Sequence, residues 1–209
     1  MPSRVRLLAP QLLPRRRPTS LPVIHHRLFV FTGLDSAGPP HRFSATRKLP
    51  FAAESLYHLI VDIDSYKSFV PYCPDSRVTQ WSELDRHGRR WPIKAVLTVG
   101  WGRITESFTS QLTCVPGVSV EAVNLDDSDR DHVGTKPVFK SLFTRWSLRP
   151  ISPQPRPQTE VHFDISYQFN SLFYDKASHA VSFKVADVMI EAFEKRAQQK
   201  LSQTSPSTY

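Results

Sequence analysis

The chain has 209 residues, of which 40% are hydrophobic, and a formal net charge of +8. This length suits one domain with appendages. The charge is uneven, because residues 1–34 hold six arginines and no acidic residue, whereas residues 49–209 carry 18 basic and 18 acidic residues. Phosphate-binding surfaces need clustered, uncompensated cations, so the balanced body argues against nucleic acid as a partner. A transmembrane helix is also excluded, since no window approaches about 18 uninterrupted apolar residues.

The first 40 residues are typical of a mitochondrial transit peptide followed by a linker. They are rich in arginine and poor in acid, although five prolines between Pro2 and Pro22 limit any amphipathic helix to short pieces. A disordered basic tail without a targeting role is the alternative. The segment SAGPPH, residues 36–41, has the composition of a linker. We therefore predict a transit peptide and linker at residues 1–40, a folded domain at 41–201 and a disordered tail at 202–209.

Cysteine usage fits a reduced compartment such as the mitochondrial matrix. Cys73 and Cys114 are 41 positions apart and neither belongs to a CxxC motif. The sequence therefore offers neither a disulfide framework nor a set of zinc ligands.

The folded part is predicted to begin with a strand at residues 41–49 and two short helices. Pro50 suits the first turn of a helix, because its missing N–H would have no partner there. Apolar residues follow at three- and four-residue spacing as far as Ile63. The second helix, at residues 65–70, must end at Pro71, which cannot continue the hydrogen-bond ladder.

Six further strands are predicted from alternating apolar and polar residues. They lie at residues 76–84, 92–101, 103–114, 118–124, 139–148 and 159–169. In the last of these, every second residue from Val161 to Phe169 is apolar, and the residues between them are polar. In residues 139–148, Leu142 and Trp146 share one face, and Phe139 and Phe143 are expected on the other. Alternation of this kind indicates an antiparallel sheet with one face in water.

A long helix is predicted at residues 175–201, and its apolar arc is wider than contact with one sheet requires. The apolar face of the sheet must be buried, and this helix is the only long candidate to cover it. The fold class is therefore α+β, with a curved antiparallel sheet of six to seven strands around a long C-terminal helix. Between sheet and helix the inward side chains either line a cavity or fill a solid core, and the pattern alone leaves both open.

Two blocks of sequence resemble the coenzyme Q-binding proteins of mitochondria, relatives of the polyketide cyclase, dehydrase and lipid-transfer (START-like) superfamily. The blocks are AESLYHLIVDIDSYKSFVPYCPDSRV and LTVGWGRITESFTSQL. The resemblance covers roughly residues 42–197. Trp101 departs from it where phenylalanine or a similar residue is expected, as do the longer loops at 126–137 and 150–158.

The resemblance implies a helix-grip (START-like) fold and a function in coenzyme Q biology. It implies ubiquinone as the bound ligand, with no catalytic cofactor and no enzymatic activity. The implied role is that of a chaperone or carrier on the matrix side of the inner membrane, peripheral to it, supporting quinone synthesis and respiration. Quinone-synthesis or respiratory-chain proteins are possible partners. The alternative is a protein-interaction module that docks such an enzyme and has only a vestigial cavity.

For the ligand we expect an apolar lining and a few polar groups for the quinone head. The expected lining comprises Phe69, Val70 and Tyr72 at the mouth, with Leu97, Val99, Trp101, Phe108, Leu142, Trp146, Val185, Val188 and Met189 around the tail. Tyr66, Ser107 and Tyr167 are the candidates for hydrogen bonds to the quinone carbonyls. Ordinary core packing is the alternative role of each apolar residue.

Neither a metal site nor a catalytic motif is predicted. The sequence contains no HExxH, GxSxG, P-loop or GxGxxG motif, and its eight histidines are scattered. A cyclase on the same fold would need an acid–base pair inside the cavity, and the inward-facing residues supply almost none.

Overall fold

The protein is described here by a computed structural model. The structure describes residues 39–101, 104–124, 139–152, 156–170 and 184–202, with only the backbone for Trp101 and Ile104. The predicted transit peptide, the loop at 126–137, the beginning of the last predicted helix and nearly all of the C-terminal tail lie outside the described residues.

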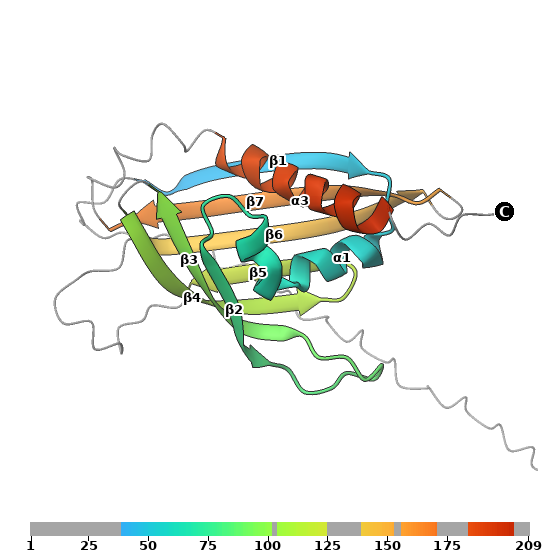
Figure 1. Ribbon diagram of the computed structural model, residues 1–209, viewed down its shortest axis with the longest axis horizontal. Helices are drawn as coiled ribbons and strands as arrows, with labels where there is room; N and C mark the ends of the chain where they lie inside the picture. Colours follow the sequence, from blue (N-terminus) through green and yellow to red (C-terminus); the bar gives the residue numbers. More distant parts are fainter. Residues whose placement is uncertain (1–38, 102–103, 125–138, 153–155, 171–183, 203–209) are drawn as a thin grey trace, which may run out of the picture. The chain divides into compact units, whose positions relative to one another are not determined.

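Seven strands form one antiparallel sheet in the order β1-β7-β6-β5-β4-β3-β2. The strands are β1 (His41–Leu49), β2 (Asp75–Trp81), β3 (Pro92–Trp101), β4 (Ile104–Val115), β5 (Ser119–Asn124), β6 (Phe139–Ser152) and β7 (Gln158–Phe169). Neighbours in sequence are neighbours in the sheet, except that β1 pairs with β7. The predicted α+β fold of a curved antiparallel sheet and one long helix is confirmed (Figure 1).

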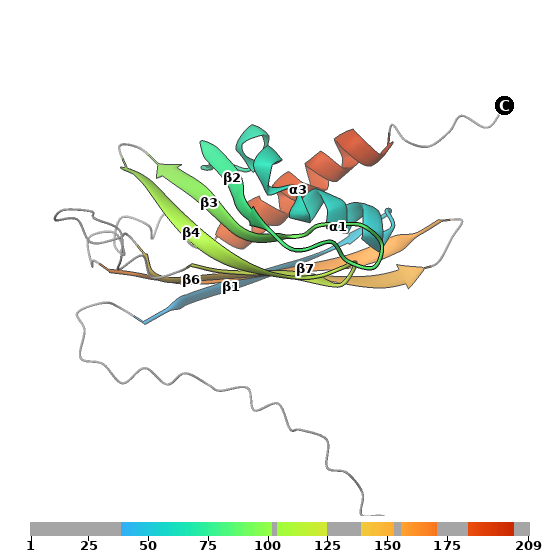
Figure 2. The same cartoon turned by 90° about the horizontal axis from the view of Figure 1, so that it is seen from below.

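The helices all lie on one face of the sheet, towards which β2 and β3 curl (Figure 2). They are α1 (Ala53–Val61), the 3-10 helix η1 (Ile63–Ser68) and α3 (Val185–Leu201). The first helix begins three residues after Pro50, so the prediction that proline starts it is wrong. Its N-cap residue Ala52 has no side chain that could cap it, and the chain enters the helix in an extended conformation. The second predicted helix is present, but it lies at residues 63–68 instead of 65–70 and is a 3-10 helix, which is wound more tightly than an α-helix.

The core lies between α3 and the concave face. Ala186, Ile190, Phe193 and Ala197 are the buried residues of α3. This set covers one side of the wide apolar arc that the sequence predicts on the last helix. In β7 the predicted inward residues include the buried Val161 and Phe163, the latter fully so. Strand periodicity therefore identified the buried face correctly.

The strand β6 departs from simple alternation near its start. Phe139 pairs with Phe169 and Ser141 pairs with Gln168, so β6 contains one extra residue between them. A bulge of this kind turns the side chains before it to the other face. Phe139 consequently lies on the same side as Leu142, and the prediction that it lies on the opposite side is wrong.

Candidate functional site

A cavity of about 360 Å³ lies between α3, the corner after η1 and the concave face of the sheet. Its walls are almost wholly apolar. The lining comprises Ile63, Tyr66, Val70, Pro71, Tyr72, Cys73, Leu97, Val99, Phe108, Ser110, Leu112, Val120, Ala122, Phe139, Leu142, Thr144, Trp146, Phe163, Ile165, Tyr167, Phe169, Lys184, Val185, Val188 and Met189. The interior is therefore not filled by the protein's own side chains, which decides the question that the sequence left open.

Strand alternation places most of these side chains. Phe108, Ser110 and Leu112 are every second residue of β4, and their neighbours on the strand face away. The helix α3 contributes the stripe that begins at Val185, beside the stripe buried in the core. The wide apolar arc of the last helix thus serves two purposes, packing on one side and lining the cavity on the other.

Aromatic rings close one end of the cavity. The ring of Trp146 packs against Phe163 and Phe193, with centroids 4.3 Å and 4.4 Å apart. Phe193 in turn contacts Tyr66 and Phe69 edge to face, at 5.1 Å and 5.0 Å. Edge-to-face pairs contribute about 0.5–1.5 kcal/mol each beyond the area they bury. This end is therefore a rigid wall.

The opposite end, which we call the mouth, carries the exposed residues of the lining. Tyr72, 53% exposed, and Lys184 at the start of α3 lie there. Tyr72 has a φ of 60°, a backbone conformation that costs a residue with a side chain energy. The backbone of Gly100 donates a hydrogen bond of 2.9 Å to its carbonyl oxygen. Pro71, Pro74 and this hydrogen bond restrict the backbone of the corner at residues 69–72, in which Tyr72 is exposed and Val70 is buried.

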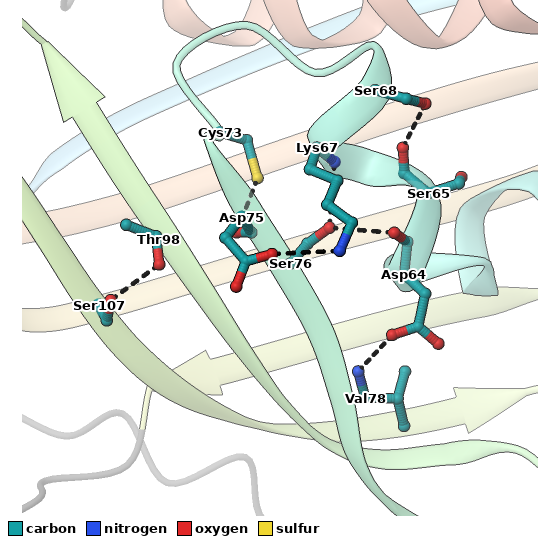
Figure 3. A network of polar contacts seen from close by, with 10 residues as sticks. All are labelled: Asp64, Ser65, Lys67, Ser68, Cys73, Asp75, Ser76, Val78, Thr98 and Ser107. Carbon is teal, nitrogen blue, oxygen red and sulfur yellow. Dashed lines mark hydrogen bonds and ion pairs between the residues drawn. The ribbon is translucent and has the colours of Figure 1, made fainter.

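A polar network fixes the corner to β2 (Figure 3). The buried hydroxyl of Ser76 accepts a hydrogen bond from the backbone of Lys67 at 3.0 Å. The carboxylate of Asp64 accepts another from the backbone of Val78 at 2.8 Å, and Lys67 forms an ion pair with Asp75. These contacts join η1 to β2. They explain how a kinked segment keeps a fixed position at the mouth.

Most of the predicted lining residues are brought together around the cavity. They are Val70, Tyr72, Leu97, Val99, Phe108, Leu142, Trp146, Val185, Val188 and Met189. Phe69 is not in the lining: its ring packs against the core, and the guanidinium of Arg196 lies 5.1 Å from its centre. The prediction that Phe69 lines the mouth is therefore wrong. The side chain of Trp101 lies outside the described residues.

Of the three candidates for hydrogen bonds to the quinone head group, two line the cavity and one does not. Tyr66 and Tyr167 line the cavity, but the hydroxyl of Tyr66 donates to the carbonyl oxygen of Ile60. Ser107 does not line it, because its neighbour Phe108 faces inward and alternation turns Ser107 outward. There it shares a hydrogen bond of 2.8 Å with Thr98. Ser107 is thus excluded as a group inside the cavity.

Sequence reasoning missed several lining residues. Ser110 and Thr144 escaped because they are polar, although each stands between two apolar residues that face inward. Phe139 was missed because nothing in the pattern signals the bulge. Pro71 and Cys73 lie in or directly after the corner, where no periodicity indicates which way a side chain points.

The chemistry of the lining suits an uncharged ligand. Among the lining residues that the structure describes there is no carboxylate and no imidazole, and Lys184 is the one cation. Burial raises the pKa of the Cys73 thiol to about 11, so it stays protonated at neutral pH. The described residues also contain no cluster of His, Cys, Asp and Glu that could hold a metal ion. A concave apolar pocket with a few polar groups is the usual form of a small-molecule binding site.

A curved sheet that grips one helix over an apolar cavity is the architecture of the helix-grip (START-like) fold, and comparison with known proteins agrees. Residues 49–194 match the family model described as polyketide cyclase / dehydrase and lipid transport. The START superfamily protein of Mycobacterium smegmatis has the same fold, with a TM-score of 0.55 and 16% identity, over 76% of this chain and 98% of that one.

The curated relatives narrow the family. The mitochondrial coenzyme Q-binding protein of Eremothecium gossypii is 30% identical over 90% of this chain and 87% of its own. That of Schizosaccharomyces pombe is 30% identical over 76% of this chain and 87% of its own. The ribosome association toxin of Escherichia coli is also similar, at 26% identity over 77% of this chain and 89% of its own. The chain belongs to the polyketide cyclase, dehydrase and lipid transport family and, within it, to the mitochondrial coenzyme Q-binding proteins.

No helix in the described part of the chain has the length and hydropathy that a membrane span needs.

Proposed function

We propose that this chain binds ubiquinone in the cavity and acts as a lipid chaperone or carrier for its synthesis and its use in mitochondrial respiratory electron transport. The apolar cavity of about 360 Å³ carries this proposal. Two similar proteins are named for coenzyme Q binding, which supports ubiquinone as the ligand. The absence of carboxylate and imidazole from the described lining favours a binding protein over an enzyme.

The energetics suit a carrier. Each methylene taken out of water gains about 0.8 kcal/mol, so an isoprenoid tail is held in a bilayer by tens of kcal/mol. A protein that removes the quinone from the membrane must offer apolar surroundings of comparable quality, which a lining with few polar groups provides. Pockets for drug-sized ligands span about 300–1,000 Å³. At about 360 Å³ this cavity holds the ring and the first part of the tail.

We place the protein on the matrix side of the inner membrane, as a peripheral protein with residues 1–40 as its transit peptide and linker. Tyr72 and Lys184 support a membrane contact at the mouth. An aromatic side chain with a polar tip suits the boundary between headgroups and acyl chains, and a cation near it is attracted to anionic lipid. Both residues are exposed and lie where a quinone would enter.

Mass spectrometry of lipids extracted from the purified chain tests the proposal. We expect ubiquinone in the extract of the wild type and none from the variant Leu97→Lys, which places a charge in the lining. Val96→Lys is the matched control, because the neighbouring residue on β3 does not line the cavity. A wild-type protein that is free of lipid but copurifies with a quinone-synthesis or respiratory enzyme would support the protein-interaction module instead.

A further inference from the structure

Two hydroxyl groups in the lining have no hydrogen-bond partner among the described residues. Ser110 on β4 is 4% exposed, and Thr144 on β6 is half-buried. Leaving a buried hydroxyl without a partner costs free energy, because its hydrogen bonds to water are lost and not replaced. A side chain without this cost, alanine or valine, would fit the same strand positions, so the chain retains two donors in a lining that is otherwise apolar.

Several other buried hydroxyls are bonded within the fold, and that of Tyr57, which has no partner among the described residues, does not line the cavity. Thr159 donates to the carbonyl oxygen of Phe51 at 2.8 Å, and Ser76 accepts from the backbone of Lys67. The hydroxyl of Tyr66, which also lies in the lining, is engaged by the carbonyl oxygen of Ile60. Ser110 and Thr144 differ from these in facing the cavity with hydroxyls that no described residue bonds, so that a ligand can use them as donors.

The register of the sheet gives the spacing of the two residues that carry these hydroxyls. The strand β5 lies between β4 and β6, and on it Asn124 is opposite Ser110 while Ala122 is opposite Thr144. The two residues are thus two strands apart and two positions apart along the strands. With strands about 4.8 Å apart and a rise of about 3.4 Å per residue, their Cα atoms are separated by roughly 12 Å.

This spacing matches a ring with two opposed acceptor oxygens. From standard bond lengths, the two carbonyl oxygens of a para-quinone lie roughly 5 Å apart, and a hydrogen bond of about 2.8 Å at each end extends the span to roughly 11 Å. The middle strand presents the small side chain of Ala122 beside the line that joins the two hydroxyls. A flat ring has room there.

We infer that Ser110 and Thr144 form the head-group site, each donating a hydrogen bond to one carbonyl oxygen of a quinone ring that lies over β5. The inference rests on the proposed function and deepens it, because it names the groups that distinguish a quinone from a plain hydrocarbon. It replaces Ser107 and Tyr66 in the role that the sequence suggested for them.

The site also sets the direction in which the ligand lies. Beyond it, the cavity is walled by Trp146 and Phe163, whereas Phe139 and Phe169 lead from it towards the mouth. The ring therefore enters first, and the isoprenoid tail runs outward past these aromatic side chains. A cavity of about 360 Å³ then suffices whatever the length of the tail.

The test compares two ligands on the purified full-length chain, ubiquinone with two isoprene units and the oxygen-free hydrocarbon farnesene. We expect Ser110→Ala and Thr144→Val each to weaken quinone binding about threefold to tenfold, and the double variant by about the product of the two. Farnesene should bind the variants at least as tightly as the wild type. Ser107→Ala and Thr113→Val, on the outward side of β4, are the matched controls and should leave both affinities unchanged.

Infrared spectroscopy of quinone bound to the wild type gives a readout that needs no variant. Two hydrogen-bonded carbonyls absorb at lower frequency than the same quinone in a hydrocarbon solvent, and that shift is the expected result. An unshifted carbonyl band, or a folded double variant that keeps wild-type quinone affinity, overturns the head-group site and leaves the proposed function standing. Failure of the wild type to bind any quinone overturns the proposed function, and this site with it.

Discussion

The carbonyl oxygen of Tyr72 accepts a hydrogen bond of 2.9 Å from the backbone of Gly100, which ties the corner after η1 to the end of β3. Tyr72 is held there at a φ of 60° with its side chain 53% exposed. Strained backbone that the surrounding structure maintains is often found at functional sites. The position of Tyr72 in the cavity lining gives this strain a purpose: it holds an aromatic side chain at the mouth.

Replacing Tyr72 by glycine should impair quinone extraction without lowering the stability of the fold. Glycine adopts a positive φ without penalty, so the strain of about 1 kcal/mol disappears, and we expect the free energy of unfolding to be unchanged or to rise by up to about 1 kcal/mol. Removal of the ring should slow extraction of ubiquinone from vesicles. Urea unfolding measures the first quantity, and transfer of quinone between vesicle populations measures the second.

Two controls accompany this variant. Tyr72→Phe keeps the ring and should transfer quinone as the wild type does. Trp81→Ala removes an exposed aromatic residue of β2 that does not line the cavity, and it should leave transfer unchanged. Transfer by Tyr72→Gly at the wild-type rate would show that the ring has no role at the mouth.

The fold was predictable because burial imposes a period on each element. In β7 the inward residues from Val161 to Phe169 follow a strict alternation, and the structure buries most of that face. Where the backbone departs from regularity, the sequence carried no signal. The bulge before Ser141 reverses Phe139, and α1 begins at Ala53, not at Pro50, because Ala52 is still in an extended conformation.

The site was predictable in its apolar part and not in its polar part. An apolar residue on an inward-facing strand position lines either a core or a cavity, so Leu97 and Phe108 could be named without knowing which. The prediction for Phe69 was wrong because the corner has no periodic pattern that shows which way a side chain points. Ser110 and Thr144 were missed because the lining was chosen by hydropathy and both residues are polar. The alternation of their own strands nevertheless points them inward.

Filling the cavity should abolish quinone binding without unfolding the protein. Ala122→Phe adds a ring to the middle of the lining, where empty space accepts it, so the cost of overpacking a solid core does not apply. We expect quinone affinity to fall more than tenfold while the free energy of unfolding changes by less than about 1 kcal/mol. Titration with ubiquinone carrying two isoprene units measures the affinity.

The neighbouring substitution Val123→Phe is the control for this variant. Val123 is 47% exposed on the other face of β5, so the same ring added there should change neither affinity nor stability much. If Ala122→Phe binds quinone as tightly as the wild type, the ligand does not occupy the cavity.

Three buried groups that lose a proton at alkaline pH, one thiol and two phenols, should make the free energy of unfolding fall at high pH. Burial raises the pKa of Cys73 from 9 to about 11, and it raises the pKa of Tyr57 and Tyr66 as well. The unfolded chain releases these protons at lower pH than the native chain does. The free energy of unfolding should therefore hold steady below pH 9 and fall as the pH rises from about 9 to 11.

Urea unfolding between pH 7.5 and 10.5 measures this loss. Cys73→Ala removes one of the three groups, so its free energy of unfolding should fall less steeply over the same range. Native protein at pH 8 should also react with iodoacetamide much more slowly than protein in urea, because only the thiolate reacts. Equal slopes for the variant and the wild type would contradict the shift of the pKa of Cys73.

Phe193 joins the helix to the closed end of the cavity, and its loss should be costly. The residue is 5% exposed and its ring contacts Tyr66, Phe69 and Trp146 at centroid distances between 4.4 Å and 5.1 Å. Truncating a buried phenylalanine to alanine removes both its transfer free energy and its packing contacts. We expect Phe193→Ala to lower the free energy of unfolding by about 3–5 kcal/mol, as measured by urea denaturation. Gln199→Ala on the exposed side of α3 should change it by less than about 0.5 kcal/mol. A loss below about 1 kcal/mol for Phe193→Ala would mean that the wall of aromatic rings does not hold α3 to the sheet.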